Sequence, residues 1–164
     1  MAILVSFVVP GRLRGKGRHR ARIARARSGA QFVQTYDDKE TRNSEAMLRS
    51  LAADAMNGRP LFTGPLILVI EQCLSHPASW SKRKKAATLF VTGKPDLDNS
   101  GKLVSDSLNK VVWGDDAQLC GLHISRYYDD SCGEFSKITV TEPEGIKVIP
   151  PLSHRTHQRE LAPA

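Results

Sequence analysis

Apolar residues recur along the 164-residue chain in two spacings, and these predict a mixture of strands and helices. Runs that are apolar throughout, or that alternate with polar residues, predict strands at 1–9, 32–36, 65–74, 87–91, 119–128 and 135–141. Helical spacing of apolar residues predicts amphipathic helices over 41–56 and 99–111. In the second helix the apolar stripe consists of Leu103, Val104, Leu108 and Val111.

Three local signals refine this pattern. The run from Leu66 to Ile70 is continuously apolar, which favours a central strand buried on both faces. Asn57 and Gly58 end the first helix. The segment from Asp129 to Gly133 has the composition of a turn, so the last two strands are predicted to form a hairpin.

Together these elements predict an α+β fold, with a mixed β-sheet and two main helices in the order β-α-β-(β)-α-β-β. A chain of 164 residues suits one domain with a single core. We expect that domain to span 1–142 and to include a basic arm at 11–29. Several prolines among polar residues predict a flexible C-terminal tail over 143–164.

The positive charge is unevenly distributed. The formal net charge is +7, and the first 36 residues contain eight Lys or Arg and no Asp or Glu. Such a cluster is typical of a surface that binds phosphate backbones. It is also typical of a disordered arm that binds any polyanion, and the sequence leaves both interpretations open. A second basic segment surrounds Trp80, which either stacks on an exposed base or anchors its loop on the core.

Other features limit the environment of the chain. No apolar run reaches the roughly 18 residues of a membrane span, and the apolar start at 1–9 is interpreted as a strand and not a signal peptide. The three cysteines are far apart in sequence: Cys73, Cys120 and Cys132. This spacing predicts a reducing cytoplasm and argues against a disulfide framework and a zinc site.

The candidate chemistry lies around two aspartates. Asp96 and Asp98 are two residues apart, so in extended backbone their carboxylates would point to the same face. Asp98 is also a candidate N-cap of the second helix, and Lys102 lies one turn further on. The pair Asp115-Asp116 follows that helix. Carboxylates beside a lysine are suited to Mg²⁺ and to a phosphate under attack, although each aspartate taken singly is more often a cap or a turn residue.

Four segments resemble the RusA-like Holliday-junction resolvases of bacteria and their prophages: Lys94-Pro-Asp-Leu-Asp-Asn99, Lys102, Asp106-Ser-Leu-Asn109 and Gly114-Asp-Asp-Ala-Gln118. Weaker similarity covers Lys16 to Arg20, Ser79 to Lys85 and His123 to Tyr128. The resemblance implies an endonuclease that acts on four-way DNA junctions as a homodimer with Mg²⁺ or Mn²⁺. It implies that Asp96, Asp98 and Asp116 bind the metal, that Lys102 is catalytic, and that Asp115 is a further candidate ligand.

The resemblance and the charge pattern also suggest which side chains contact DNA: Arg12, Arg14, Lys16, Arg18, Arg20, Arg22, Trp80, Lys82, Lys84 and Lys94. One departure from the family pattern stands at Ser100-Gly101, where members usually have a bulky apolar residue. Two other functions stay open. One is a nuclease of the same fold that prefers flaps or forks, and the other is a DNA-binding protein in which the acids are only structural.

Overall fold

The computed structural model of the protein describes residues 2–17, 20–36 and 38–144, so the predicted tail lies outside the described residues from position 145 on. The elements follow one another in this order: β1 (Ile3–Pro10), β2 (Arg20–Arg25), β3 (Gln31–Tyr36), α1 (Lys39–Met56), β4 (Leu66–Leu74), α2 (Lys82–Ala87), α3 (Leu97–Leu108), the short 3-10 helix η1 (Asp116–Gln118), β5 (Leu119–Tyr128) and β6 (Phe135–Thr141). The predicted α+β class is confirmed. Within the described residues, no helix has both the length and the apolar character needed to cross a membrane.

The main sheet is mixed and has the strand order β1-β6-β4-β5. β4 pairs in parallel with β5 and antiparallel with β6, and β6 pairs antiparallel with β1. The predicted hairpin of the last two strands is therefore wrong, because β4 lies between β5 and β6. The continuously apolar β4 is buried along nearly its whole length. β4 has a neighbouring strand on each side, so its predicted central position is confirmed.

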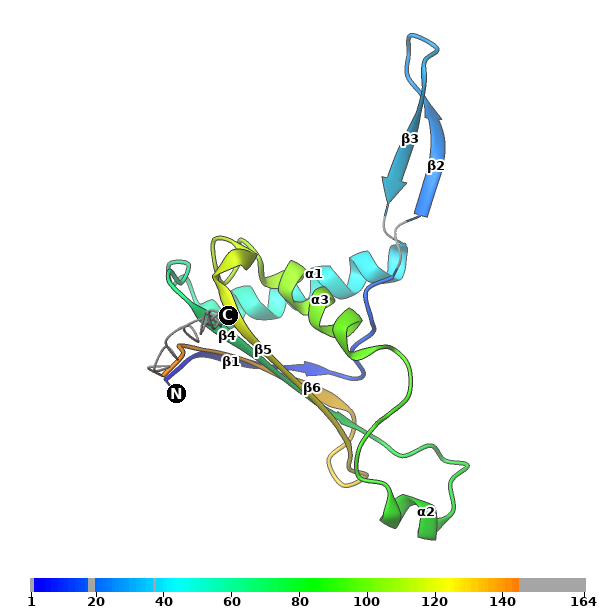
Figure 1. Cartoon of the computed structure of the whole chain (residues 1–164), viewed down its shortest axis with the longest axis vertical. Helices are drawn as coiled ribbons and strands as arrows, with labels where there is room; N and C mark the ends of the chain where they lie inside the picture. Colours follow the sequence, from blue (N-terminus) through cyan, green and yellow to red (C-terminus); the bar gives the residue numbers. More distant parts are fainter. Residues whose placement is uncertain (1, 18–19, 37, 145–164) are drawn as a thin grey trace, which may run out of the picture.

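The two main helices, α1 and α3, pack against each other and lie over one side of the sheet (Figure 1). α1 begins after Asp38, whose carboxylate accepts a 2.7 Å hydrogen bond from the backbone of Thr41, and it ends where Asn57 adopts the left-handed conformation. The predicted stripe of α3 is buried at Leu103, Val104 and Leu108. A hydrophobic core thus forms between the helices and the sheet.

At the Ser100-Gly101 departure, the distance between helix and sheet explains the glycine, whereas nothing in the structure explains Ser100. Both residues are buried in α3. A Cβ added to Gly101 would lie 2.7 Å from Cδ1 of Ile124 and 3.1 Å from Cδ2 of Leu122, both on β5. Because any side chain at this position would crowd β5, glycine lets α3 approach the edge strand closely.

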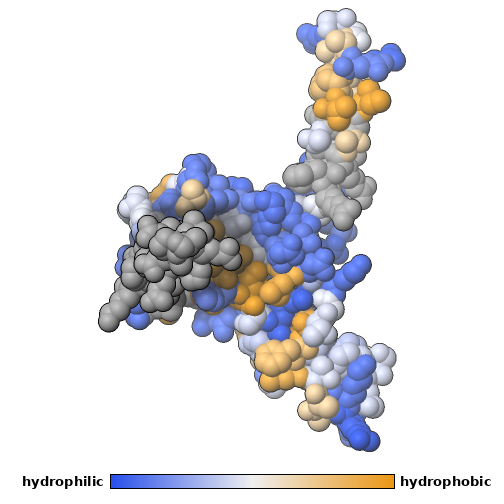
Figure 2. Space-filling model, in the orientation of Figure 1, coloured by the Kyte–Doolittle hydropathy of each residue, from blue (hydrophilic) through white to orange (hydrophobic). Residues whose placement is uncertain are grey.

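Part of the basic arm is an ordered hairpin. β2 pairs antiparallel with β3, from Arg20 opposite Tyr36 to Arg25 opposite Gln31, and the hairpin projects away from the body of the protein (Figure 1). β3 was predicted from the sequence, but β2 was not. Figure 2 shows apolar surface partway along this projection, and its exposed apolar residues are Ile23, Phe32 and Val33.

The predicted strand at 87–91 is wrong. Residues 82–87 form the short helix α2 instead, and Ser81 caps it by accepting a hydrogen bond from the backbone of Lys84. The segment after α2 runs beside the end of β5, where the backbone of Val91 donates to Arg126 and that of Tyr128 donates to Leu89. These bonds amount to one isolated bridge, between Phe90 and Tyr127, and not to a strand.

Candidate active site

The aspartate motif stands at the start of α3. The helix begins at Leu97 with Asp96 as its N-cap residue, and the Asp96 side chain makes no capping hydrogen bond. Asp98 lies inside the first turn, so its prediction as the N-cap is wrong. The predicted extended backbone holds at Asp96, whose φ is −64° and ψ is 147°, but not at Asp98, which is helical. The reason is that the helix starts at Leu97, two residues before its predicted start at position 99.

The loop that leads into the motif is held from two sides. A guanidinium nitrogen of Arg12 donates a 3.0 Å hydrogen bond to the backbone carbonyl of Lys94. A guanidinium nitrogen of Arg126 on β5 donates a 2.6 Å hydrogen bond to the carbonyl of Pro95. The Lys94–Pro95 peptide bond is cis. The backbone just before Asp96 is therefore fixed by residues distant in sequence, and both anchoring arginines were missed as positioning residues in the sequence analysis.

Asp98 and Lys102 line the same open hollow between α3 and β5, which has a volume of about 450 Å³ and is also lined by Ser105 and Cys120. Asp98 borders a second, larger hollow of about 780 Å³ together with Glu71 and His123. The side chain of Lys102 is 64% exposed, and its Nζ lies 3.7 Å from a carboxylate oxygen of Asp106. A carboxylate and an ammonium thus border one surface that is open to a large polyanion.

The second acidic pair is bound into local structure. Asp115 caps η1 by accepting a 2.8 Å hydrogen bond from the backbone of Ala117, and Gln118 completes a capping box. Asp116 accepts a 2.9 Å hydrogen bond at Oδ1 from the indole of Trp113, which is fully buried. Asp116 is therefore held in a defined orientation by the core, whereas the carboxylate of Asp115 is engaged as a cap.

The ligand atoms of the predicted acids do not form a trio within 4.8 Å of one another in the described residues. Across the part of the chain that the structure describes, the only trio of acidic, thiol or imidazole groups whose ligand atoms all lie within 4.8 Å of one another is formed by Cys73, Asp129 and Cys132. α3 has 12 residues and so spans roughly 18 Å. Asp98 lies in its first turn, and Asp116 follows its last turn along the chain. The predicted ligands are carboxylates, which Mg²⁺ prefers. Within one chain, however, Asp96, Asp98 and Asp116 do not form a complete three-carboxylate site.

The basic arm is attached directly to the motif helix. The backbone N–H of Lys16 donates a 3.0 Å hydrogen bond to the carbonyl of Asn99. The ammonium of Lys16, only 12% exposed, contacts the carboxylate of Asp106 and lies 3.3 Å from that of Glu45. Burial lowers the pKa of Lys16, but its hydrogen bonds and attraction to these carboxylates outweigh burial and raise the pKa above 10.5. Lys16 thus anchors the arm, and its predicted DNA contact remains a prediction.

The other predicted DNA contacts fall into three groups. Arg12 and Arg14 are exposed, and Arg14 pairs with Glu40 at the surface. Arg18 lies outside the described residues, and for Arg20 and Arg22 the structure describes the backbone of β2 alone. The third group is exposed and lies on α2 or in the segment between α2 and α3: Lys82, Lys84 and Lys94.

Trp80 belongs to a small aromatic cluster beside α2. Its ring meets Tyr128 edge-on at 5.5 Å and lies 5.9 Å from the ring of His76, between ring centroids. Nζ of Lys84 stands 4.0 Å from the centre of the indole. These contacts place Trp80 against the end of β5, outside the hydrophobic core on which one of the two interpretations anchored its loop. Stacking on a base remains a prediction.

Sequence spacing concealed two further contacts. Nδ1 of His76 lies 3.3 Å from Oδ2 of Asp130, which is 54 residues further along the chain. The thiols of Cys73 and Cys132, which are 59 residues apart, lie 3.4 Å from each other. The wide sequence spacing of the cysteines was taken as an argument against a zinc site. That argument does not hold, because the sheet places two of the three thiols in contact.

Comparison with known proteins gives two matches. The sequence model of a family described as "Endodeoxyribonuclease RusA" matches residues 10–140, which include the basic arm, the aspartate motif and η1. The chain is also 30% identical over 134 residues to a protein of Bacillus subtilis (strain 168) named "Uncharacterized protein YqaN". That alignment covers 77% of this chain and 89% of the Bacillus protein.

Proposed function

The chain belongs to the RusA family of endodeoxyribonucleases, and from this premise we propose that it is a divalent-metal-dependent nuclease that resolves four-way DNA junctions by paired phosphodiester hydrolysis. One structural observation supports the proposal above the others. The basic arm is bonded to the very loop and helix that present Asp98 and Lys102, through Arg12 to Lys94 and through Lys16 to Asn99. A phosphate backbone held by the arm would therefore lie next to these two side chains.

The proposed roles follow from the chemistry of each group. Asp96, Asp98 and Asp116 would hold Mg²⁺ or Mn²⁺, with Asp115 as a further candidate. When bound, the ion supplies an activated water and stabilises negative charge on the attacked phosphate. Lys102 has an exposed ammonium on the same hollow as Asp98. It would pair with a non-bridging phosphate oxygen and stabilise the charge that grows there.

A homodimer suits both the substrate and the arrangement of the acids. A four-way junction has approximate two-fold symmetry, and paired incisions need two active sites, which a C₂ dimer provides. A two-fold axis near the middle of α3 would also bring the end of one α3 to the start of the other. Asp116 of the partner subunit would then complete the ligand set begun by Asp96 and Asp98, which one chain leaves open.

The experiment that tests this function compares DNA substrates directly. Purified protein is incubated with a synthetic four-way junction, a flap and a plain duplex, with and without Mg²⁺. We expect Mg²⁺-dependent, symmetrically related nicks in the junction and little cutting of the duplex. Equal or better cutting of the flap would instead indicate a broader structure-selective nuclease.

One observation favours a second candidate, a DNA-binding protein without catalytic activity. The three predicted acids form no trio of ligand atoms within 4.8 Å among the described residues, and Asp115 and Asp116 both have local hydrogen-bonding roles. On this alternative the unaltered protein binds junctions but cuts none of the substrates in Mg²⁺ or Mn²⁺. The same experiment therefore decides between the two candidates.

A further inference from the structure

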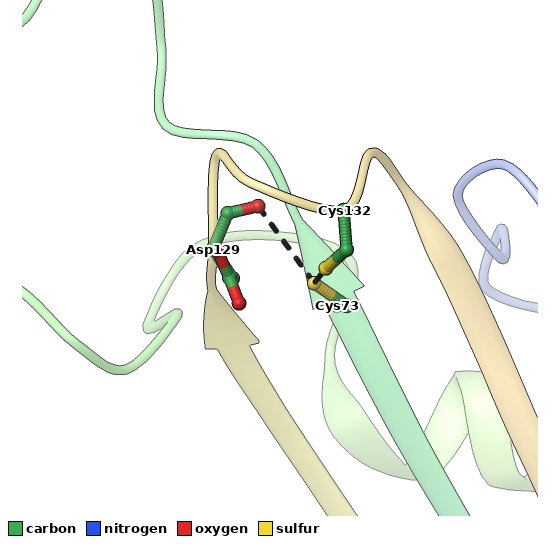
Figure 3. A group of neighbouring side chains, drawn as sticks. All are labelled: Cys73, Asp129 and Cys132. Atoms are coloured by element: carbon green, nitrogen blue, oxygen red, sulfur yellow. Dashed lines mark hydrogen bonds between the residues drawn. The ribbon is translucent and has the colours of Figure 1, made fainter.

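Two thiols and a carboxylate meet at the end of β4 (Figure 3). Cys73 is a fully buried residue of β4, and Cys132 is an exposed residue of the loop between β5 and β6. Their Sγ atoms are 3.4 Å apart, and a carboxylate oxygen of Asp129 completes a group whose members all lie within 4.8 Å. The Cys73 thiol also donates a weak 3.8 Å hydrogen bond to the backbone carbonyl of Asp129.

The loop is folded in a way that presents its two ligands together. Oδ1 of Asp129 accepts hydrogen bonds from the backbone (2.8 Å) and the hydroxyl (2.6 Å) of Ser131, which curls the chain and leaves Oδ2 available. Gly133 then turns the chain into β6 with a φ of +74°, a conformation that favours glycine. Asp129 and Cys132 are three positions apart, the shorter of the ligand spacings found in zinc-binding loops.

We propose that Cys73, Cys132 and Asp129 form a binding site for a zinc-class divalent ion, with the fourth position open to solvent on the side of Cys132. Thiolates select soft or borderline metals such as Zn²⁺ over Mg²⁺. With Zn–S bonds of about 2.3 Å, two sulfurs of a tetrahedral site stand roughly 3.8 Å apart. The observed 3.4 Å is nearer to this value than to the roughly 2.05 Å of a disulfide.

The charges around the thiols support a cation site over a redox pair. The Cys73 side chain is buried, and its polar neighbours are the thiol of Cys132 and the residue Asp129. Reactive redox cysteines normally lie in electropositive surroundings that favour the thiolate. Here the neighbours are acidic, so a bound cation is the group that would stabilise two thiolates together.

A metal at this position would connect segments that surround the basic helix α2. The residue after Asp129 is Asp130, whose carboxylate accepts a 2.8 Å hydrogen bond from the backbone of His76 and lies 3.3 Å from Nζ of Lys85. Fixing the loop to β4 would therefore also fix Asp130, and through it the approach to α2. The ion would serve a structural role that is independent of the proposed nuclease site.

The test uses Co²⁺ and Zn²⁺ as probes of the full chain, reduced and freed of metal, with excess Mg²⁺ present to occupy carboxylate sites. We expect one Co²⁺ per chain, with thiolate-to-cobalt charge-transfer absorption and the visible bands of tetrahedral cobalt. Zn²⁺ should displace the Co²⁺ and raise the Tm by at least about 5 °C. These readouts do not depend on nuclease activity.

Three variants make the result decisive. Cys132→Ser changes an exposed residue and should abolish the charge-transfer band, and Asp129→Asn should weaken Co²⁺ affinity by at least about 10-fold. Cys120→Ser, which removes the remaining cysteine, is the matched control and should bind Co²⁺ as the unaltered chain does. The proposal is overturned if the unaltered chain shows no thiolate band, or if the band survives Cys132→Ser. It is equally overturned if the reduced chain binds no metal and mild oxidation joins Cys73 to Cys132.

Discussion

The ammonium of Lys16 contacts the carboxylate of Asp106, 90 residues further along the chain, and so ties the basic arm to the exposed side of the motif helix. The contact is largely shielded, since the two side chains are 12% and 24% exposed. A residue predicted to bind phosphate is thus engaged within the protein. The arm can therefore be loosened by a change that leaves its other basic residues intact.

Replacing Lys16 with Met should destabilise the fold by about 1–3 kcal/mol, because it leaves Glu45 partly buried without its cation and leaves Asp106 only the exposed ammonium of Lys102, 3.7 Å away. The matched control is Arg14→Met, which breaks an ion pair whose side chains are 62% and 66% exposed and should cost about 0–1 kcal/mol. Urea unfolding of both variants measures the difference. Similar losses for the two would show that Lys16 has no anchoring role.

The Lys16 contribution should also depend on pH in a definite direction. Its pKa is raised in the folded chain above 10.5, so the folded state holds the proton more tightly than the unfolded state. By linkage, the stabilisation is fully present below the unfolded pKa of about 10.4 and is lost as pH rises through the folded pKa. The stability gap between the unaltered chain and Lys16→Met should hold constant from neutral pH upward and narrow only in strongly alkaline solution.

Because Gly101 lies close to Ile124, we predict that substitutions at these two positions have coupled effects on stability. Alanine at 101 gains about 1 kcal/mol of helix propensity, but its Cβ would stand 2.7 Å from Cδ1 of Ile124, and overpacking costs about 1–3 kcal/mol. We expect Gly101→Ala to be destabilising in the natural background and neutral or stabilising in Ile124→Val, which lacks that methyl group. Thermal unfolding of the four proteins gives the coupling. Gly93→Ala, where a Cβ meets nothing within 4 Å, is the control.

Comparison of the predicted and observed α3 shows what a single sequence can and cannot predict. Its buried stripe was predicted because apolar spacing is a local property, and Leu103, Val104 and Leu108 are indeed fully buried. Its start was misplaced because Asp96 and Asp98 are both good cap residues, and local chemistry alone does not choose between them. Asp98 lies in the first turn of this 12-residue helix and Asp116 follows its last turn, so the whole helix separates them along the chain. This consequence was overlooked because the family motif names the acids together.

Other errors arose from long-range pairing. The last two strands looked like a hairpin because the loop after Asp129 has turn composition, yet β4 pairs with both strands and separates them. The contact of Cys73 with Cys132 depends on the same topology, so sequence spacing gave no sign of it. β2 was missed because it consists mainly of arginines and alanines. The strand projects away from the core, so neither of its faces is buried there and its sequence needs no alternation of apolar and polar residues.

If the proposed nuclease is correct, Asp98→Asn and Lys102→Gln should separate cutting from binding. Each removes a charge that borders the hollow beside α3, so each should lower the rate of junction cleavage by at least about 100-fold. Junction affinity should change little for Asp98→Asn, because the basic arm is unaltered. Single-turnover cleavage and gel-shift titration measure the two quantities. Asp54→Asn, an exposed carboxylate on α1, is the matched control and should cut normally. Full activity in Asp98→Asn would contradict the assignment.

The proposal that two subunits share each active site predicts rescue between inactive chains. Asp98→Asn and Asp116→Asn homodimers should both fail to cut, since every site lacks a ligand. In a heterodimer purified with two affinity tags, one shared site loses both residues, but the other keeps Asp98 of one chain and Asp116 of its partner. That heterodimer should therefore nick one strand of a junction. Pairing Asp98→Asn with Asp96→Asn is the control and should restore nothing, because both changes affect the same half of the site. If the first heterodimer is as inactive as the second, the acids act within one chain, and α3 must move for Asp116 to reach the metal.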